Sequence, residues 1–174
     1  MTASMHCFNA TERISFGEPA VAAVIKELDR TASQRVFVLG SRSVAATPSY
    51  RAIVQALGER CVGQFTGITA HVPQSCVLEG AQAVRAARAD VLLAIGGGSV
   101  IDATKVMLVA LKKDLSTPAQ LHEAAVFAAT DGSVRPPDAA EWLRMIAVPT
   151  TLSAAEFTWF AGCSDTDAGV KEIF

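Results

Sequence analysis

Short apolar runs alternate with longer amphipathic segments along most of this chain. Residues 35–39 (Arg-Val-Phe-Val-Leu) and 90–95 (Asp-Val-Leu-Leu-Ala-Ile) are aliphatic, aromatic or β-branched after their first residue, and a glycine follows each run. Such runs are typical of parallel strands that are buried on both faces. A third run, Met145–Val148, ends at Pro149, and Cys61–Phe65 is a weaker fourth whose glycine and period-2 pattern suit an edge position. The pattern therefore predicts four strands.

Segments with a helical period separate these runs. From Pro19 to Arg30, from Gln74 to Arg88 and from Ser99 to Lys112, apolar residues recur at the spacing of one helix face. The alternation of strand and helix predicts an α/β fold, with βαβ units, right-handed crossovers and a parallel sheet covered by helices. The 174 residues contain no internal repeat, and we expect a single domain over residues 1–174.

The segment from Asp114 to Trp142 interrupts this alternation. Residues 117–130 are expected to form a short helix that begins at Thr117-Pro118, and residues 131–137 are expected to form a loop. We expect the segment to lie on the surface beside the main sheet.

Composition agrees with a packed domain and excludes several classes of partner. Hydrophobic residues make up 51% of the chain and charged residues 18%, which is typical of buried parallel strands and not of disorder. The net charge of −2 provides no basic stripe for a nucleic-acid backbone or an anionic membrane. The N-terminus lacks the basic and apolar regions of a secretory signal, and no apolar stretch has the length of a membrane span. We therefore expect a cytoplasmic protein.

A glycine-rich turn follows the second strong strand. Gly96 to Gly98 lack Cβ atoms, so a ligand can approach the backbone, and the first turn of the following helix favours an anion such as a pyrophosphate. Ser99 can either cap that helix or bond the phosphate, and Asp102 is placed to accept from a ribose hydroxyl or from the nicotinamide side. The turn is neither a G-x-G-x-x-G fingerprint nor a P-loop, and a tight strand-to-helix connection is the alternative.

A second polar turn follows the strand at residues 145–148. Thr150 and Thr151 stand at its carboxyl end, at the sheet edge where ligands gather in open α/β folds. Ordinary turn residues are the alternative for the two threonines. Together the two turns predict a cleft at one edge of the sheet.

These two motifs resemble those of the iron-containing (group III) alcohol dehydrogenase family, within the dehydroquinate-synthase-like superfamily. The matching stretches are Gly96–Asp102 with Lys105 in the following helix, and Ala147–Thr151 followed by Glu156–Thr158. The resemblance runs along nearly the whole chain and implies a Rossmann-like three-layer N-terminal domain. The sequence is most similar to maleylacetate reductase, because Pro-Thr-Thr reaches Glu-x-Thr one residue sooner than in common alcohol dehydrogenases. Leu152–Ala155 departs from the family, which usually has glycine there.

The resemblance implies an oxidoreductase that transfers hydride between NAD or NADP and a carbonyl, alcohol or enoic acid substrate. Maleylacetate is the first expectation, and a simple alcohol or aldehyde is the second. The implied contacts are the pyrophosphate at the glycine turn, the nicotinamide-side ribose at Asp102, and the cofactor at the two threonines. His71 lies in a loop that borders the cofactor in relatives, and a turn residue is its alternative role. The implied cofactor-binding residues are Gly40, Ser41, Arg42, His71, Gly96, Gly97, Gly98, Ser99, Asp102, Thr150 and Thr151.

The end of the first long strand bears on the choice of cofactor. Many relatives carry an Asp near Gly40 and Ser41 that holds the adenosine ribose diol, and this sequence has no acid there. Ser41 with Arg42 could tolerate or favour a 2′-phosphate, so NAD and NADP both stay open. A solvated surface charge is the alternative for Arg42.

The histidines and cysteines make a poor metal site. His6 with Cys7, and His122 with Glu123, are adjacent in sequence and therefore diverge on a strand or helix. We assign no metal to this chain. The four cysteines lie far apart without a C-x-x-C pair and are interpreted as ordinary buried thiols: Cys7, Cys61, Cys76 and Cys163.

The resemblance also implies a part that this sequence lacks. Relatives are longer and carry an α-helical C-terminal domain that supplies an Asp and His ligands for iron or zinc, whereas this sequence ends at Phe174. We therefore assign no catalytic residue and expect the fragment alone to be inactive, with apolar surface exposed where the second domain would pack. Relatives often dimerise through an edge of this domain, so the resemblance implies a homodimer.

Two other functions remain as alternatives. The chain could be a nucleotide-binding or interaction module that has lost catalysis, or a lyase related to dehydroquinate synthase that uses NAD as an internal redox cofactor. The spacing of the two turn motifs favours the oxidoreductase over the lyase. Only downstream sequence separates the oxidoreductase from the module.

Overall fold

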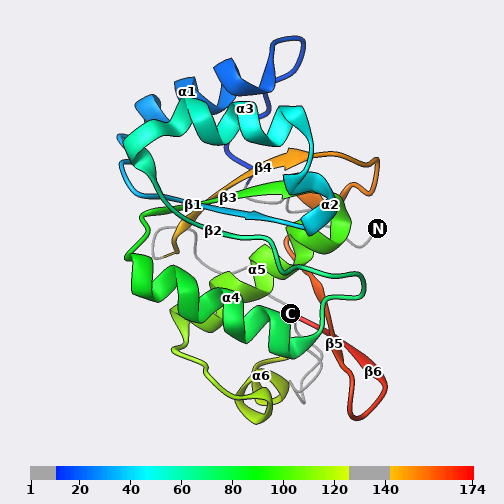
Figure 1. Cartoon of the computed structure of the whole chain (residues 1–174). Helices are drawn as coiled ribbons and strands as arrows, with labels where there is room; N and C mark the ends of the chain where they lie inside the picture. Colours follow the sequence, from blue (N-terminus) through cyan, green and yellow to red (C-terminus); the bar gives the residue numbers. More distant parts are fainter. Residues whose placement is uncertain (1–10, 126–141) are drawn as a thin grey trace, which may run out of the picture.

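A four-stranded parallel sheet forms the centre of the computed structural model, which describes residues 11–125 and 142–174 (Figure 1). The strands lie in the order β2-β1-β3-β4, and every neighbouring pair is parallel. Their arrowheads point to the same side, so the turns that follow them share one edge of the sheet. The four predicted strands are confirmed, and the edge position of the second is correct: β1 (Val36–Gly40), β2 (Cys61–Phe65), β3 (Val91–Gly96) and β4 (Arg144–Pro149).

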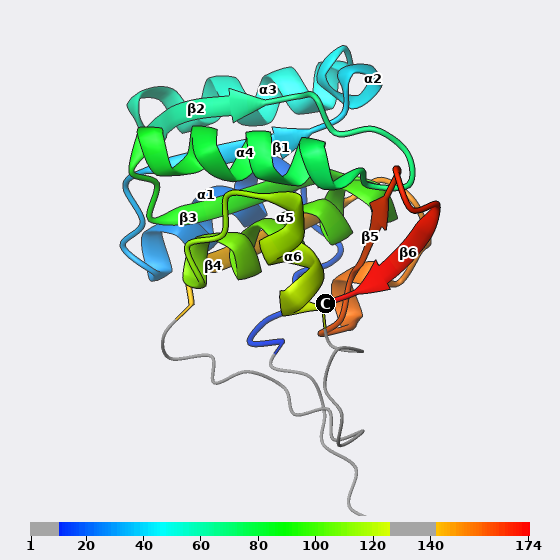
Figure 2. The same ribbon diagram turned by 90° about the horizontal axis from the view of Figure 1, so that it is seen from below.

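Helices cover both faces of this sheet. Helices α1 and α3 lie on one face, and α4 and α5 lie on the other (Figures 1 and 2), which confirms the three-layer α/β architecture. No helix in residues 11–125 and 142–174 is long and apolar enough to cross a membrane. The helices are α1 (Ala20–Arg30), α2 (Arg42–Ala45), α3 (Pro48–Leu57), α4 (Gln74–Ala87), α5 (Gly98–Lys112) and α6 (Pro118–Ala124).

The uniform hydrophobicity of β1 follows from its place between two helical layers. Val36 and Val38 pack into the core beneath α1 and α3, whereas Phe37 and Leu39 pack into the core beneath α4 and α5. Because side chains alternate between the faces of a strand, a strand covered on both sides must be apolar throughout. β3 shows the same alternation and is buried along its whole length.

Helices α1 and α4 each differ from the predicted range by one residue, and the boundaries of α5 and α6 differ in ways that bear on the prediction. Helix α5 begins at Gly98 and not at Ser99, with Gly97 as its N-cap and no capping side chain, so the alternative in which Ser99 caps the helix is wrong. Helix α6 ends at Ala124, earlier than the expected residue 130, although Thr117 caps it as predicted. The predicted loop at 131–137 lies outside the described residues.

The placement of α6 also corrects the sequence analysis. We expected this part of the chain to lie on the surface beside the sheet. The surface position is confirmed, since Leu121 is the one buried residue of α6. The helix packs against the layer that contains α4 and not beside the sheet (Figure 2).

Helices α2 and α3 and the strands of a C-terminal hairpin were not predicted. Helix α3 begins with the same Thr-Pro signal as α6, because the Thr47 hydroxyl accepts from the backbone N–H of Tyr50. A hairpin of β5 (Gly162–Asp165) and β6 (Val170–Ile173) follows a 3-10 turn at Ala155–Phe157. The short helix α2 follows β1 directly.

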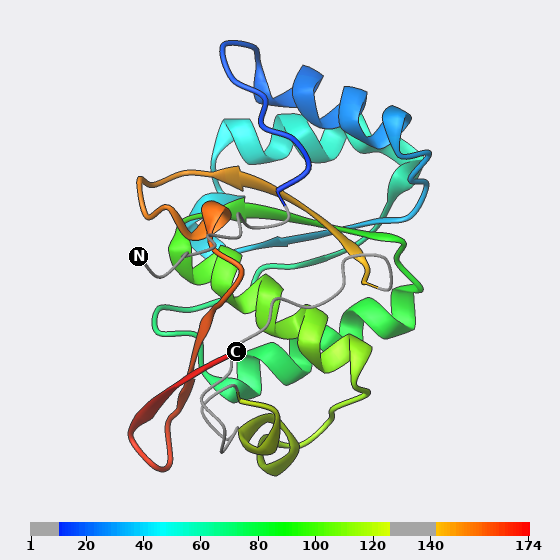
Figure 3. The same cartoon turned by 180° about the vertical axis from the view of Figure 1, so that it is seen from behind.

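The N-terminal segment before α1 runs past β4 (Figure 3). Glu12 pairs with Arg144 at the start of β4 and with Arg30 at the end of α1, where the nitrogen lies 2.9 Å from the carboxylate oxygen. These exposed ion pairs contribute little stability individually, and they link Glu12 to the first residue of β4 and the last residue of α1.

The described cysteines are free thiols. Cys76 and Cys163 are buried as expected, whereas Cys61 is only half-buried. Burial raises the pKa of Cys163 to about 12, so its thiol stays protonated at neutral pH. Cys7 and its neighbour His6 lie outside the described residues.

Candidate dinucleotide-binding edge

The glycine turn joins a fully buried strand to a long helix. Gly96 ends β3, Gly97 is the N-cap, and the 15 residues of α5 begin at Gly98. The carbonyl of Gly97 accepts from the backbone N–H groups of Val100 (2.9 Å) and Ile101 (3.2 Å). Gly98 and Ser99 come before these two residues, at the start of the helix, so their backbone N–H groups have no carbonyl acceptor within it. These donors and the helix dipole together favour an anion at this end of α5.

The first glycine of the turn has a packing role. A Cβ atom on Gly96 would lie 2.4 Å from Cγ2 and 2.6 Å from Cβ of the buried Val100. The tight strand-to-helix connection that was the alternative to a phosphate site therefore explains Gly96. It does not explain the next two glycines, whose missing Cβ atoms face a different segment.

The structure brings the two predicted turns together. The backbone N–H of Thr150 donates to the carbonyl of Gly96 (3.0 Å). A Cβ atom on Gly97 would lie 2.9 Å from Oγ1 of Thr151, and one on Gly98 would lie 3.0 Å from Cβ of Ser153. Ser153 was missed by the sequence analysis, which treated residues 152–155 only as a departure from the family. These contacts form one wall beside the helix N-terminus, and a cleft there stays a prediction.

Asp102 and Lys105 connect α5 to the segment that follows the second turn. Oδ2 of Asp102 accepts from the backbone N–H of Gly162 (3.4 Å). The Lys105 ammonium donates to the hydroxyl of Thr158 (2.9 Å) and to backbone carbonyls of the same segment. Burial lowers the pKa of Lys105, while the carboxylates of Asp102 and Glu156 act in the opposite direction. The residues that carried the resemblance are therefore in direct contact.

The residues expected to influence the choice between NAD and NADP lie at the end of β1. Ser41 caps α2, because its hydroxyl accepts from the backbone N–H of Val44 (3.3 Å). Arg42 is exposed in the first turn of α2 and forms no ion pair with another described residue. A Cβ atom on Gly40 would lie 3.1 Å from the ring of Tyr50, so packing alone accounts for this glycine. Cofactor contacts at these three residues stay predictions.

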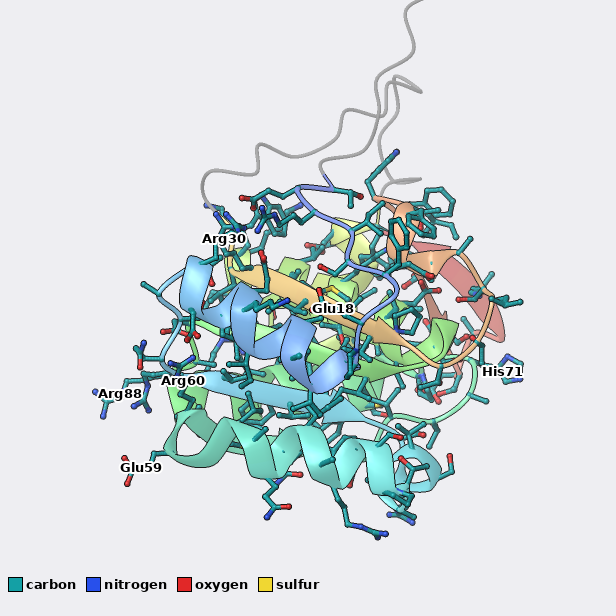
Figure 4. All side chains as sticks on the ribbon, turned by 90° about the horizontal axis from the view of Figure 1, so that it is seen from above. Glu18, Arg30, Glu59, Arg60, His71 and Arg88 are labelled. Carbon is teal, nitrogen blue, oxygen red and sulfur yellow. The ribbon has the colours of Figure 1, made fainter. Side chains whose placement is uncertain are left out.

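His71 occupies a strained turn after β2. Its φ is +66°, its carbonyl accepts from the Ser164 hydroxyl (2.6 Å), and its imidazole is exposed and points away from the body of the molecule (Figure 4). The β5–β6 hairpin also binds the next residue, Val72, whose carbonyl accepts from the backbone N–H of Ser164 (2.8 Å). This geometry agrees with a turn residue, and a cofactor contact stays a prediction.

The described residues do not fit an iron or zinc ion. Within residues 11–125 and 142–174, no group of three His, Cys, Asp or Glu side chains could hold a metal. His122 instead pairs with Glu172, with 2.5 Å between Nδ1 and Oε1, and Glu172 also accepts from Gln74 (2.7 Å). The hydrogen bond to Glu172 raises the pKa of His122.

Apolar side chains are exposed on the segment after β4. Leu152 is 105%, Phe157 48% and Phe160 44% exposed, which is unusual for large apolar residues that lie close together in the sequence. A second domain that covers them stays a prediction.

Comparisons with known proteins agree with this geometry. The sequence model of one family, iron-containing alcohol dehydrogenase, matches residues 11–174. A dehydrogenase of Alternaria alternata is 34% identical over 142 residues, which cover 81% of this chain and 36% of that protein. Maleylacetate reductase 1 of Cupriavidus pinatubonensis is 33% identical over 162 residues, which cover 91% of this chain and 35% of that protein.

Solved structures share the fold. Maleylacetate reductase from Agrobacterium tumefaciens aligns with a TM-score of 0.69 at 24% identity, covering 100% of this chain and 39% of that one. Sulfoacetaldehyde reductase from Bifidobacterium kashiwanohense, in complex with NAD+, aligns with a TM-score of 0.76 at 18% identity, covering 91% of this chain and 39% of that one. The chain thus spans well under half the length of these relatives.

Proposed function

This chain belongs to the iron-containing alcohol dehydrogenase family, and we propose that it is the NAD(P)-binding part of an oxidoreductase of the maleylacetate reductase type. The proposal rests on one observation above all. The glycine turn at the N-terminus of α5 lies close against the loop after β4: a Cβ atom on Gly97 would lie 2.9 Å from Thr151, and one on Gly98 would lie 3.0 Å from Ser153. This arrangement provides backbone donors, a helix dipole and hydroxyl groups at the carboxyl edge of a parallel sheet, where dinucleotides bind.

The residues of this chain would bind and orient the dinucleotide. The first-turn N–H groups of Gly98 and Ser99 would bond the pyrophosphate, and the Ser99 hydroxyl is available for it because it does not cap the helix. Thr150 and Thr151 would contact the cofactor from the adjacent strand. Asp102 uses Oδ2 for Gly162, and its second carboxylate oxygen would accept from a ribose hydroxyl on the nicotinamide side.

The chemistry of the reaction would come from the nicotinamide ring, which donates or accepts a hydride when it is bound. The substrate would be a carbonyl, alcohol or enoic acid, with maleylacetate as the first expectation. The contribution of the described residues is orientation and electrostatics. They offer no metal site, so no step here is assigned to iron or zinc.

Arg42 supports the binding of NADP as well as NAD. Its guanidinium is exposed beside Ser41 at the end of β1, and residues 36–45, which form β1 and α2, include no carboxylate to bind a ribose diol. A guanidinium at this place would pair with a 2′-phosphate.

A titration of the purified chain with NADH and NADPH, followed by fluorescence, tests the proposal. Saturable binding of at least one cofactor is the expected result. If neither binds at millimolar concentration, even when any downstream sequence of the gene is restored, the proposed function is wrong.

The variant Gly98→Val probes the glycine turn, but its side chain would first meet Ser153. The comparison is therefore between the double variant Gly98→Val/Ser153→Gly and the single variant Ser153→Gly. Both lack the Ser153 side chain, so its clash with a residue at position 98 does not affect the difference between them. Weaker cofactor binding by the double variant is expected, because a branched side chain restricts the approach of the pyrophosphate. Equal affinities would remove Gly98 from the site.

A further inference from the structure

The ammonium group of Lys105 lies within a ring of acceptors from one loop. Its Nζ donates to the carbonyls of Ala155 (2.5 Å), Phe160 (3.1 Å) and Thr158, and to the Thr158 hydroxyl (2.9 Å). An ammonium has three N–H donors, so these four acceptors saturate it. All of them belong to residues 155–160.

The Thr158 hydroxyl completes the ring. While its oxygen accepts from Lys105, its own proton can be donated to the carbonyl of Ala155 (3.1 Å) or of Phe160 (3.2 Å). Glu156, in the same loop, adds a negative charge near the ammonium, and its Oε2 is buried without a hydrogen-bond partner. The loop is therefore arranged around a cation that α5 supplies.

The same segment touches α5 at two further levels. At the N-terminus of the helix, Thr151 and Ser153 lie against the missing Cβ atoms of the glycine turn. One turn later, Asp102 accepts from Gly162. Asp102 and Lys105 are three residues apart and therefore share one face of the helix. Residues 151–162 thus follow α5 from the glycine turn to Lys105.

Apolar burial contributes little to holding this loop. Among residues 151–160, only Ala155 is buried, while the large side chains of Leu152, Phe157 and Phe160 are exposed. A segment with few buried apolar contacts opens easily unless polar contacts hold it. The hydrogen bonds that Lys105 donates to the segment are charge-assisted, and such bonds are stronger than those between neutral groups.

We propose that Lys105 is a positioning residue for dinucleotide binding: it holds residues 155–160 against α5, and thereby keeps Thr151 and Ser153 against the glycine turn. This inference rests on the proposed function. Lys105 acts through the loop, because the acceptors of its ammonium group belong to residues 155–160.

The test compares Lys105→Met with Lys113→Met, the same substitution at an exposed lysine just after the same helix. Hydrogen exchange of residues 151–162 measures the loop, and titration with NADH and NADPH measures the site. Loss of hydrogen bonds to a charged group should accelerate exchange of the loop by about tenfold or more, and weaken cofactor binding by about tenfold. Lys113→Met should match the unmodified chain in both measurements.

A second pair of variants covers the case in which Lys105→Met does not fold. Thr158→Val removes the hydroxyl from the ring at nearly constant shape, and Thr158→Ser keeps it. Thr158→Val should show a smaller change in the same direction, whereas Thr158→Ser should resemble the unmodified chain.

Each result decides a separate point. Unchanged exchange in the folded variants would refute the role of Lys105 in holding the loop. Faster exchange with unchanged affinity would show that the loop positions nothing in the site, and would refute the inference while leaving the proposed function standing. If the unmodified chain binds neither cofactor, the proposed function fails, and the inference fails with it.

Discussion

Replacing Gly96 with alanine tests whether the glycine turn is set by packing or by a ligand. The new Cβ would lie 2.4 Å from Cγ2 and 2.6 Å from Cβ of Val100, well inside the 3.4 Å at which ordinary contacts begin. Val100 is 3% exposed and stands in the first turn of α5, so its Cβ cannot move unless the helix moves away from β3. The strain falls in the upper part of the range for overpacked cores, about 3 kcal/mol.

Gly98→Ala is the matched control. Its Cβ would lie 3.0 Å from Cβ and 3.1 Å from Oγ of Ser153, which is exposed and can move aside. For a chain of this length, Gly96→Ala should lower Tm by about 6 to 12 °C, and Gly98→Ala should leave it within about 2 °C. Thermal unfolding followed by circular dichroism measures both values.

A third variant separates the two atoms of Val100 that cause the clash. Adding Val100→Ala to Gly96→Ala removes Cγ2 but leaves Cβ at 2.6 Å, so it should not restore Tm. Equal changes in Tm for Gly96→Ala and Gly98→Ala would refute this reasoning, and so would full rescue by Val100→Ala.

Three further predictions concern other parts of the molecule. Arg42→Ala should weaken NADPH binding by about tenfold relative to NADH, because a bond between charged groups is lost. The control Arg51→Ala, at another exposed arginine, should leave the ratio of the two affinities unchanged. An unchanged ratio in Arg42→Ala would mean that Arg42 is only a solvated surface charge. The raised pKa of His122 means that its contact with Glu172 is fully present below about pH 6.5 and is lost as pH rises through the raised value. Proton NMR of the imidazole and hydrogen exchange of α6 should follow that transition, and a midpoint below the ordinary histidine value would contradict it. Leu121→Ala should destabilise the chain by about 2 to 5 kcal/mol in chemical denaturation, because Leu121 is fully buried between α6 and the helical layer; a change near zero would mean that α6 is not part of the core.

The sequence by itself determined the layers of this fold. Uniform apolar runs identified β1 and β3, since only strands covered on both faces need such runs, and the glycine and period-2 pattern of Cys61–Phe65 placed β2 at an edge. Local capping signals located α6 through Thr117. The same Thr-Pro signal at Thr47 and Pro48 could have located α3, because Tyr50 and later apolar residues recur at helical spacing.

Contacts between distant segments depended on tertiary structure. The resemblance named Lys105 and Thr158 as members of two motifs, but nothing in the spacing of residues 53 positions apart shows that one binds the other. Ser153 was overlooked because its importance arises from its distance to Gly98, and the hairpin β5–β6 was not predicted at all. Periodicity reports which face of an element is buried. Only the packed structure shows which loop lies against that face, because the partners of Lys105 are a hydroxyl and backbone carbonyls 50 to 55 positions away, at a separation that no local period reports.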